Sequence, residues 1–291
     1  MIDLHVHSNH SDGTCAPEDL VSLAVQTGLS AFALTDHDTV SGISSAKAAA
    51  LQTGASAPAV TVISGAELSA AYHKKDIHIL GLFIDETNPD LLTALEQAVN
   101  ARDRRNEQMA ERFRSLGIPL TLDELRLLNP DTVITRAHFA KYLIEHRYVK
   151  NSEEAFRRYL NYDAPCFVPR EYMQPERAIS LILQAGGIPV LAHPLLYRLP
   201  PEELEALLKR LTCAGLKGLE VYYSSNTGFD EQICYSLANR FGLLMTGGTD
   251  FHGDNKPHLY LGTGRNNNLN IPDELLEPLY AYLRTSEKKA K

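Results

Sequence analysis

Histidines and acidic residues close a series of short apolar runs along this 291-residue chain. Imidazole and carboxylate ligands without thiolate suit manganese, iron or zinc. Nine such residues are enough for two or three divalent ions that share a bridging carboxylate, and this arrangement favours hydrolysis of a charged substrate such as a phosphate ester. The candidate ligands are His5, His7, Asp12, His37, Glu67, His78, His193, Asp250 and His252.

Several of these residues have an ordinary structural explanation when they are taken one at a time. Asp12 stands in a Ser-Asp-Gly sequence that is typical of a turn. His78 alternates with isoleucines, as a buried core histidine would. Glu67 is harder to explain, because it lies among small and apolar residues where an unpaired carboxylate is costly. A bridging role between metal ions would remove that cost.

The spacing of the histidines supports the metal interpretation. His5 and His7 are two residues apart on an expected strand, so their side chains project to the same face and could bind one ion together. His37 lies between Asp36 and Asp38, and either carboxylate could orient a ligating imidazole through a hydrogen bond.

The elements that must position these side chains alternate between β-prone runs and helical patterns. This alternation indicates βαβ units, a largely parallel sheet and an α/β fold. Most candidate ligands then lie at the carboxyl ends of strands, where parallel barrels carry their chemistry. Strands are expected at 2–6, 31–35, 59–65, 77–84, 188–192, 218–222 and 243–247, and helices at 17–27, 40–53, 175–185, 201–213, 228–241 and 273–285.

The alternation stops between about residues 98 and 168. Helices separated by polar loops are expected there instead, at 90–116, 121–128, 135–147 and 151–161. We therefore expect an all-helical insertion at 98–168 that caps the substrate and divides a catalytic domain made of residues 1–97 and 169–291.

Composition restricts the partners and the compartment. The net charge of -8 argues against stable binding to DNA or other long nucleic acid, which depends on basic residues that neutralise phosphates. No run of about 18 apolar residues suggests a membrane segment, and no basic region precedes an apolar run at the N-terminus. The four cysteines form no Cys-x-x-Cys pair, so neither a disulfide framework nor a thiolate zinc site is indicated. A cytoplasmic protein is expected.

The motifs occur in a recognisable order: H-x-H, S-D-G, T-D-H-D, G-x-E, a later histidine, A-H-P and T-D-x-H. This order closely resembles the PHP (polymerase and histidinol phosphatase) superfamily of metal-dependent phosphoesterases. The resemblance implies a distorted, TIM-like (β/α)7 barrel with a trinuclear metal centre. It implies one ion bound by His5, His7, Glu67 and Asp250, a second by Glu67, His78 and His193, and a third by Asp12, His37 and His252.

Two further motifs lie in the expected insertion, Arg102-Asp-Arg-Arg105 and Ile134-Thr-Arg-Ala-His138. They resemble the branch of the superfamily that acts on 3',5'-nucleotide bisphosphates, with relatives that trim RNA from the 5' end. The resemblance implies that Arg102, Arg105, Thr135 and Arg136 hold substrate phosphate or ribose, and arginine suits this role because it binds phosphate through paired hydrogen bonds. Without the resemblance, Arg102 and Arg105 would be expected to cover an exposed helix face.

The expected reaction is removal of the 3'-phosphate from a small nucleotide such as 3'-phosphoadenosine 5'-phosphate. Asp12, His37 and His252 are the expected catalytic residues, in contact with the phosphate or close to the leaving oxygen. The alternatives are a 5'-3' exoribonuclease acting on short RNA 5' ends in the same site, a histidinol-phosphate phosphatase, and a non-enzymatic metal-binding accessory domain. Tyr222 and Tyr223 could stack on a base or serve as core aromatics.

Overall fold

The computed structural model describes residues 1–53, 60–73, 75–130, 132–169 and 173–290. Seven strands in these residues form one sheet, and their order in the sheet is their order along the chain. The strands are β1 (Ile2–Val6), β2 (Ala31–Leu34), β3 (Thr61–Tyr72), β4 (Lys75–Leu82), β5 (Ile188–Leu191), β6 (Gly218–Tyr223) and β7 (Leu244–Gly248).

The sheet is largely parallel, as predicted, but one strand is reversed. β4 runs antiparallel to both β3 and β5, whereas the other neighbouring pairs are parallel. Only residues 73 and 74 separate β3 from β4, and a parallel crossover needs about a dozen residues or more. The short connection therefore forces a hairpin, in which Tyr72 pairs with Lys75.

Backbone hydrogen bonds between β1 and the segment after β7 bring the sheet close to a closed barrel. The amide of Asp250 donates to the carbonyl of His5 at 2.8 Å, and the amide of His7 donates to the carbonyl of Phe251 at 3.0 Å. The two strands approach most closely at Gly248, where an added Cβ would lie only 2.3 Å from the Cβ of His5. Closure therefore requires a residue without a side chain at this position.

In the part of the chain that the structure describes, six α-helices accompany the strands of the barrel. Apolar side chains from these helices and from the sheet form three buried clusters, one of which packs Leu20 and Val21 against Phe32. The helices are α1 (Pro17–Thr27), α2 (Ile43–Thr53), α7 (Pro175–Gln184), α8 (Pro201–Cys213), α9 (Asp230–Phe241) and α10 (Leu276–Ala290).

Most expected elements agree with the structure to within two or three residues, and the third strand is the main exception. Its expected start at residue 59 lies outside the described residues, and its expected end at residue 65 is wrong. β3 continues to Tyr72 because the hairpin with β4 extends its ladder of hydrogen bonds. Glu67 consequently lies within a strand and not after one.

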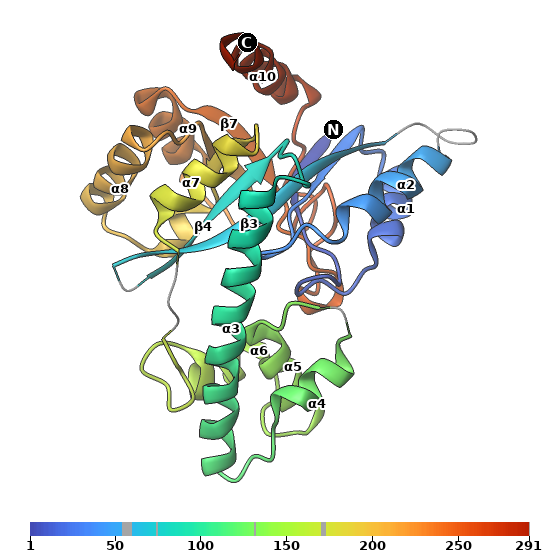
Figure 1. Cartoon of the computed structure of the whole chain (residues 1–291), viewed down its shortest axis with the longest axis vertical. Helices are drawn as coiled ribbons and strands as arrows, with labels where there is room; N and C mark the ends of the chain where they lie inside the picture. The colour runs from blue at the N-terminus through green and yellow to red at the C-terminus, as the bar shows by residue number, and fades with distance from the viewer. Residues whose placement is uncertain (54–59, 74, 131, 170–172, 291) are drawn as a thin grey trace.

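Helices also fill the region where an insertion was expected. They are α3 (Pro89–Ser115), α4 (Leu122–Leu128), α5 (Arg136–Glu145), α6 (Ser152–Ala155) and a π-helical turn (Phe156–Leu160), and they extend away from the sheet in Figure 1. Residues between 109 and 168 form a hydrophobic cluster of their own, with Phe113 stacked on Phe139. The first turns of α3 instead join the barrel core through Leu91 and Leu95. A domain boundary at residue 98 would fall inside this continuous helix, so the proposed division stays a prediction.

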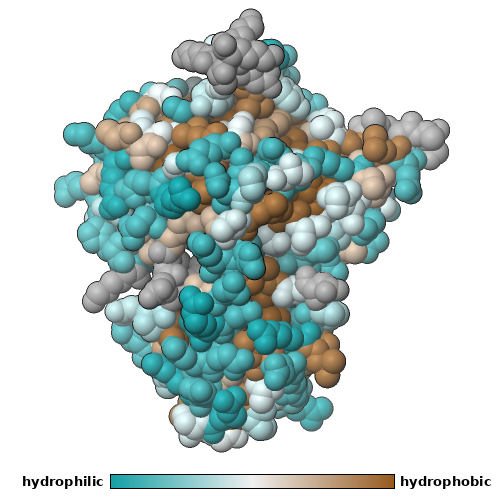
Figure 2. Space-filling model, in the orientation of Figure 1, coloured by the Kyte–Doolittle hydropathy of each residue, from teal (hydrophilic) through white to brown (hydrophobic). Residues whose placement is uncertain are grey.

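Polar side chains cover most of the surface in view in Figure 2, with apolar ones in smaller patches. The exposed apolar residues include Leu127 at the end of α4, which is 82% exposed. Among the described residues, none of the helices combines the length and the apolar composition that a bilayer-spanning segment needs.

Replacement of Gly248 by alanine tests the closure of the barrel. The new methyl group would overlap β1, and overpacking of this kind typically costs about 1–3 kcal/mol. Gly42→Ala is the matched control, because Gly42 also lacks a positive φ and an added Cβ there would meet only side-chain atoms, at 3.1 Å or more. We expect Gly248→Ala to lower the melting temperature more than Gly42→Ala does, and equal melting temperatures would contradict the closure argument.

Candidate metal centre and substrate pocket

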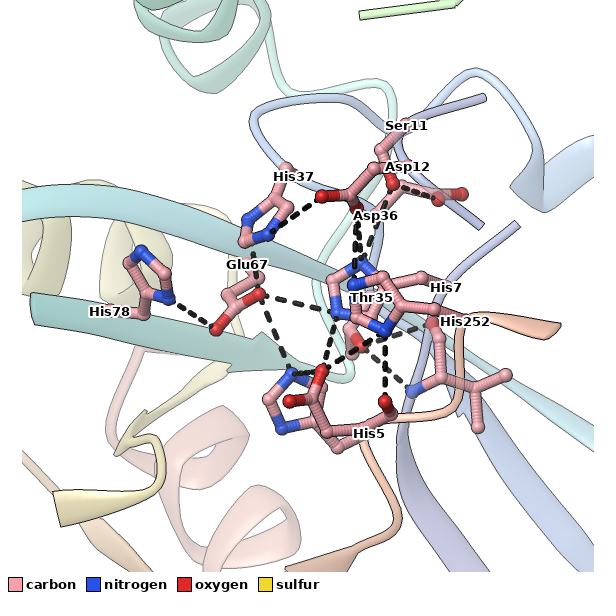
Figure 3. Close-up of polar contacts among 12 residues, drawn as sticks. His5, His7, Ser11, Asp12, Thr35, Asp36, His37, Glu67, His78 and His252 are labelled. Atoms are coloured by element: carbon pink, nitrogen blue, oxygen red, sulfur yellow. Dashed lines mark hydrogen bonds and ion pairs between the residues drawn. The ribbon is translucent and has the colours of Figure 1, made fainter. Parts of the chain in front are cut away.

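The nine predicted ligands meet in one buried cluster at the end of the barrel where the parallel strands finish, and seven of them are labelled in Figure 3. Glu67 lies at the centre of this cluster. Its Oε1 is 2.8 Å from Nδ1 of His78 and 3.1 Å from Nε2 of His193. Its Oε2 faces Nδ1 of His37 at 3.0 Å, Nε2 of His7 at 3.2 Å and Nε2 of His5 at 3.5 Å. One carboxylate thus faces five imidazoles.

The reversed strand explains how His78 reaches this end of the barrel. In the β3–β4 hairpin His78 pairs with Ser69, two residues beyond Glu67 along β3. Because β4 runs in the opposite direction, its first half lies beside the carboxyl ends of the parallel strands. His78 therefore joins the cluster from inside a strand, where the rule for parallel strands would not have placed a ligand.

Two aspartates complete the set of carboxylates. Oδ1 of Asp12 lies 3.1 Å from Nε2 of His252, and Oδ2 lies 3.8 Å from Nε2 of His37. Oδ1 of Asp250 lies 3.4 Å from Nε2 of His7 and 3.3 Å from Nδ1 of His252. The same Nδ1 of His252 donates to the backbone carbonyl of Asp250 at 2.8 Å, which leaves Nε2 with the lone pair that a metal ligand needs.

The donor atoms fit divalent cations. Several are buried but accept or donate no hydrogen bond among the described residues, including Nε2 of His5, Nε2 of His7 and Oδ1 of Asp12. Buried polar atoms without partners are rare in folded proteins, and a bound ion is one accepted explanation. Ligand atoms lie within 4.8 Å of one another in four groups: His5, His7 and Glu67; His37, Glu67 and His78; His5, His193 and Asp250; and His7, Asp12, His37 and His252.

The three-ion assignment agrees with these groups only in outline. Asp12, His37 and His252 fall together as expected, with His7 added to them. His193 groups with His5 and Asp250, although its Nε2 also lies 3.1 Å from Glu67. The cluster could hold metal ions, and the partition of its ligands among individual ions stays a prediction.

The electrostatics of the cluster favour charged carboxylates. Burial raises the pKa of Glu67, but the imidazoles of His78, His37 and His5 outweigh burial and hold it well below its usual range. Burial likewise raises the pKa of Asp12, while His37 and His252 lower it by more. Burial also brings the pKa of His37 down to about 3, so this imidazole is neutral. Burial lowers the pKa of His5 and His7, but the facing carboxylates outweigh it and raise both, that of His7 to about 9. A bound divalent ion would displace these protons, because metal binds ionised carboxylates and neutral imidazoles.

Glu220 on β6 is a functional residue that the sequence analysis missed. Its Oε1 lies 2.9 Å from Nδ1 of His5, and its Oε2 accepts from the backbone amide of His193 at 2.7 Å. His193 has a φ of 27°, a strained value that this hydrogen bond helps to hold. One carboxylate thus orients two candidate ligands. The signal was an acidic residue inside the otherwise apolar run of β6.

Tyr223 and Lys256 were also missed as partners of a ligand. The hydroxyl of Tyr223 donates to Oδ2 of Asp250 at 2.8 Å, and Nζ of Lys256 lies 2.5 Å from the same oxygen. These contacts leave Oδ1 of Asp250 to face the histidines. Tyr223 is buried with its hydroxyl engaged, so of the two roles considered for it, the structural one holds. Tyr222 is half-buried and packs against the barrel core.

The expected role of the aspartates beside His37 is corrected by the structure. Asp36 accepts from the amide and hydroxyl of Ser8 and from the hydroxyl of Ser11 at 2.6 Å. The Ser11 hydroxyl lies 3.4 Å from Nδ1 of His7, so the influence of Asp36 reaches His7. Asp38 accepts from the amide and hydroxyl of Ser69 and pairs with Arg102. The carboxylates near the ring of His37 are instead those of Glu67 and Asp12.

The four predicted substrate-binding residues line one cavity with part of the metal cluster. The cavity has a volume of about 140 Å³, and its walls include Arg102, Arg105, Thr135 and Arg136 together with Asp12, His37 and His78. Arg102 and Arg105 are only 7% and 4% exposed, so the alternative that they cover an exposed helix face is wrong. Arg102 is held by Asp38, and Arg136 by Asp76 at 2.8 Å.

The N-terminus of α5 opens onto this cavity. Arg136 and Ala137, the first two residues of α5, form part of the wall. The amides at a helix N-terminus attract anions. The cavity thus combines guanidinium groups and a helix N-terminus on one side with candidate metal ligands on the other, a combination suited to a substrate with two phosphates.

Comparison with known proteins agrees with this geometry. The family model described as the PHP domain matches residues 3–162, which is more than half of the chain. The chain belongs to the PHP family. Curated relatives align with 86% of this chain, so the similarity extends beyond the segment that the family model matches. The predicted family and the predicted phosphoesterase chemistry are confirmed.

Three relatives illustrate the range of names attached to similar proteins. A 5'-3' exoribonuclease from Haemophilus influenzae is 35% identical over 86% of this chain and 89% of its own. A 3',5'-nucleoside bisphosphate phosphatase from Chromobacterium violaceum is 34% identical over 86% of this chain and 87% of its own. A solved structure of an amidohydrolase from Chromobacterium violaceum, with bound sulfate and no metal, has a TM-score of 0.85 and 32% identity over 98% of this chain and 96% of its own.

The central position of Glu67 predicts that its removal affects more than one ion. We expect the purified protein, loaded with manganese and desalted, to retain two or three ions per chain by mass spectrometry, and Glu67→Ala to lose most of them. Glu86→Ala is the control, because Glu86 pairs with Lys47 and Ser64 outside the cluster. A full complement of metal in Glu67→Ala would show that this carboxylate does not bridge ions.

Glu220 should influence metal affinity without touching the metal. Loss of a residue that orients a ligand typically weakens metal binding about 10- to 100-fold. We therefore expect Glu220→Gln to bind manganese at least about 10-fold more weakly in a calorimetric titration, with the fold retained by circular dichroism. Glu231→Gln on the exposed face of α9 is the control. Identical affinities in the two variants would rule out the orienting role.

Proposed function

We propose that this protein removes the 3'-phosphate from nucleoside 3',5'-bisphosphates, such as 3'-phosphoadenosine 5'-phosphate, to give a nucleoside 5'-monophosphate and inorganic phosphate. The observation that carries the proposal is that candidate metal ligands and buried arginines line the same cavity. The relative from Chromobacterium violaceum named for this activity supports it. A substrate with one phosphate would leave one of these two groups unused.

Different residues of the cavity would bind the two phosphates. Arg102, Arg105 and Arg136 would bind the 5'-phosphate, with Asp38 and Asp76 holding two of these side chains in position. The 3'-phosphate would then lie against the cluster around Glu67, beside Asp12, His37 and His252. When bound, divalent ions supply activated water and neutralise charge on the scissile phosphate. Manganese, iron and zinc all suit the donor set.

The three proposed catalytic residues differ in what they can do. His37 and Asp12 line the cavity directly, so they can contact the phosphate or the leaving oxygen. His252 is buried behind Asp12, with its Nε2 3.1 Å from Oδ1 of Asp12, and these two atoms would bind the third ion together.

A 5'-3' exoribonuclease activity on short RNA is the second candidate. A larger cavity of about 570 Å³ borders the substrate pocket at Ala137 and runs between α5 and residues 254–257. This volume has room for a nucleotide attached through the scissile phosphate. The name of the relative from Haemophilus influenzae supports the same activity. Histidinol phosphate, by contrast, offers no second phosphate to the arginines.

All four cysteines are unpaired, in keeping with a reducing cytoplasm.

Release of phosphate from 3'-phosphoadenosine 5'-phosphate in the presence of manganese tests the proposal. Adenosine 3'-monophosphate is the matched substrate, because it lacks only the 5'-phosphate. We expect Arg102→Ala to lower kcat/KM on the bisphosphate by about 10- to 100-fold, since hydrogen bonds to charged groups contribute about 1.5–3 kcal/mol, and to change kcat/KM on the monophosphate much less.

Arg104→Ala is the control variant, because Arg104 lies on the same helix with its side chain exposed. It should behave as the unmodified protein on both substrates. No phosphate release from the bisphosphate would sink the proposed function, and an equal loss on both substrates in Arg102→Ala would remove the arginine from 5'-phosphate recognition.

A further inference from the structure

Thr135 makes a direct contact between the helical region and the metal cluster. Its hydroxyl donates to Oδ2 of Asp12 at 3.2 Å and accepts from the amide of Ala137 at 3.1 Å as the N-cap of α5. A hydroxyl carries one donor and two acceptor sites, so both bonds form at once. Thr135 and Asp12 are buried, at 4% and 7% exposure. The start of α5 is thereby tied to a candidate metal ligand.

This contact belongs to a longer seam between two segments. The hydroxyl of Thr132 donates to the carbonyl of Asn9 at 2.6 Å, and the amide of Val133 donates to the carbonyl of His10 at 3.1 Å. With the bond from Thr135 to Asp12, three successive contacts join residues 132–135 to residues 9–12. A shift of the segment that leads into α5 would therefore carry the loop of Asp12 with it.

The same segment forms part of the proposed 5'-phosphate site. Arg136 and Ala137 directly follow Thr135 and line the substrate cavity with Arg102 and Arg105. A phosphate bound there would fix the first turn of α5 and, with it, the hydroxyl of Thr135. On the other side of Asp12, Oδ1 lies 3.1 Å from Nε2 of His252. The side chain of Asp12 thus lies between Thr135, which adjoins the proposed 5'-phosphate site, and His252, which is expected to bind the third ion.

We propose that Thr135 is a positioning residue that couples 5'-phosphate binding to occupancy of the metal site formed by Asp12, His37 and His252. A nucleotide with a 5'-phosphate raises the affinity of this site for a divalent ion, and the ion raises the affinity for the nucleotide by the same factor. The coupling selects substrates, because a nucleotide without a 5'-phosphate leaves the third ion weakly bound. This inference rests on the proposed assignment of the 5'-phosphate site.

Manganese titrations of the metal-free full-length protein test the coupling without turnover. The titrations are made alone, with saturating adenosine 5'-monophosphate, and with adenosine at the same concentration. We expect the nucleotide to lower the dissociation constant of the weakest manganese site by about fivefold or more, within the usual range of coupling between sites. Adenosine should leave that constant unchanged. An unchanged constant with the nucleotide, or no binding of the nucleotide, overturns the proposal.

Two variants assign the coupling to the hydroxyl. The measured quantity is the manganese dissociation constant without nucleotide divided by the constant with adenosine 5'-monophosphate. Thr135→Ser keeps the hydroxyl and should keep this ratio, whereas Thr135→Val should reduce it below twofold. Thr121→Val is the control for loss of a helix cap, because Thr121 caps α4 through the amide of Glu124 and, among the described residues, makes no hydrogen bond to the cluster. A full ratio in Thr135→Val, or an equal reduction in Thr121→Val, overturns the role of Thr135.

The outcome is separable from that of the proposed function. Phosphate release from the bisphosphate with a ratio near one would reject the coupling alone. A ratio of fivefold or more without phosphate release would reject the proposed reaction and leave the coupling in place.

Discussion

The buried carboxylate of Glu67 is the constraint on which the rest of the site depends. A charged group removed from water is strongly destabilising unless partners compensate for it. Here five imidazoles surround one carboxylate, and several of their nitrogens lack hydrogen bonds among the described residues. The imidazoles alone leave these nitrogens without partners, whereas divalent ions would satisfy both the carboxylate and the nitrogens. The cluster therefore needs bound cations, because contacts among its own side chains leave buried polar atoms without partners.

Holding this cluster together requires support from beyond the ligands. Glu220 fixes His5 and the strained backbone of His193, while Tyr223 and Lys256 occupy one oxygen of Asp250. These residues lie on or after the strands of the second half of the chain. The barrel brings them against β1 and β3 because the segment after β7 bonds to β1, which is possible only with glycine at position 248.

The helical region supplies the arginines that line the substrate cavity. α3 is continuous from the barrel core to the outer helices, so its buried arginines are held rigidly over the end of the barrel. The start of α5 lines the same cavity and contacts Asp12 through Thr135. The proposed phosphate site and the metal cluster thus belong to one continuous structure. A ligand bound at one of them would change the affinity of the other.

Much of this protein follows from its sequence alone. The periodicity of apolar residues predicted the strands and helices, and the ligand types and their order predicted the cluster and the family, because these signals are local. The ladder of β3 to Tyr72 and the reversal of β4 depended on strand pairing, which placed Glu67 inside a strand and brought His78 to the carboxyl ends of the parallel strands. The partners of Asp36, Asp38, Glu220 and Thr135 were decided by contacts between residues far apart in the chain, and no local pattern specifies such contacts. The sequence determined which groups do the chemistry, and the tertiary structure decided which of them touch.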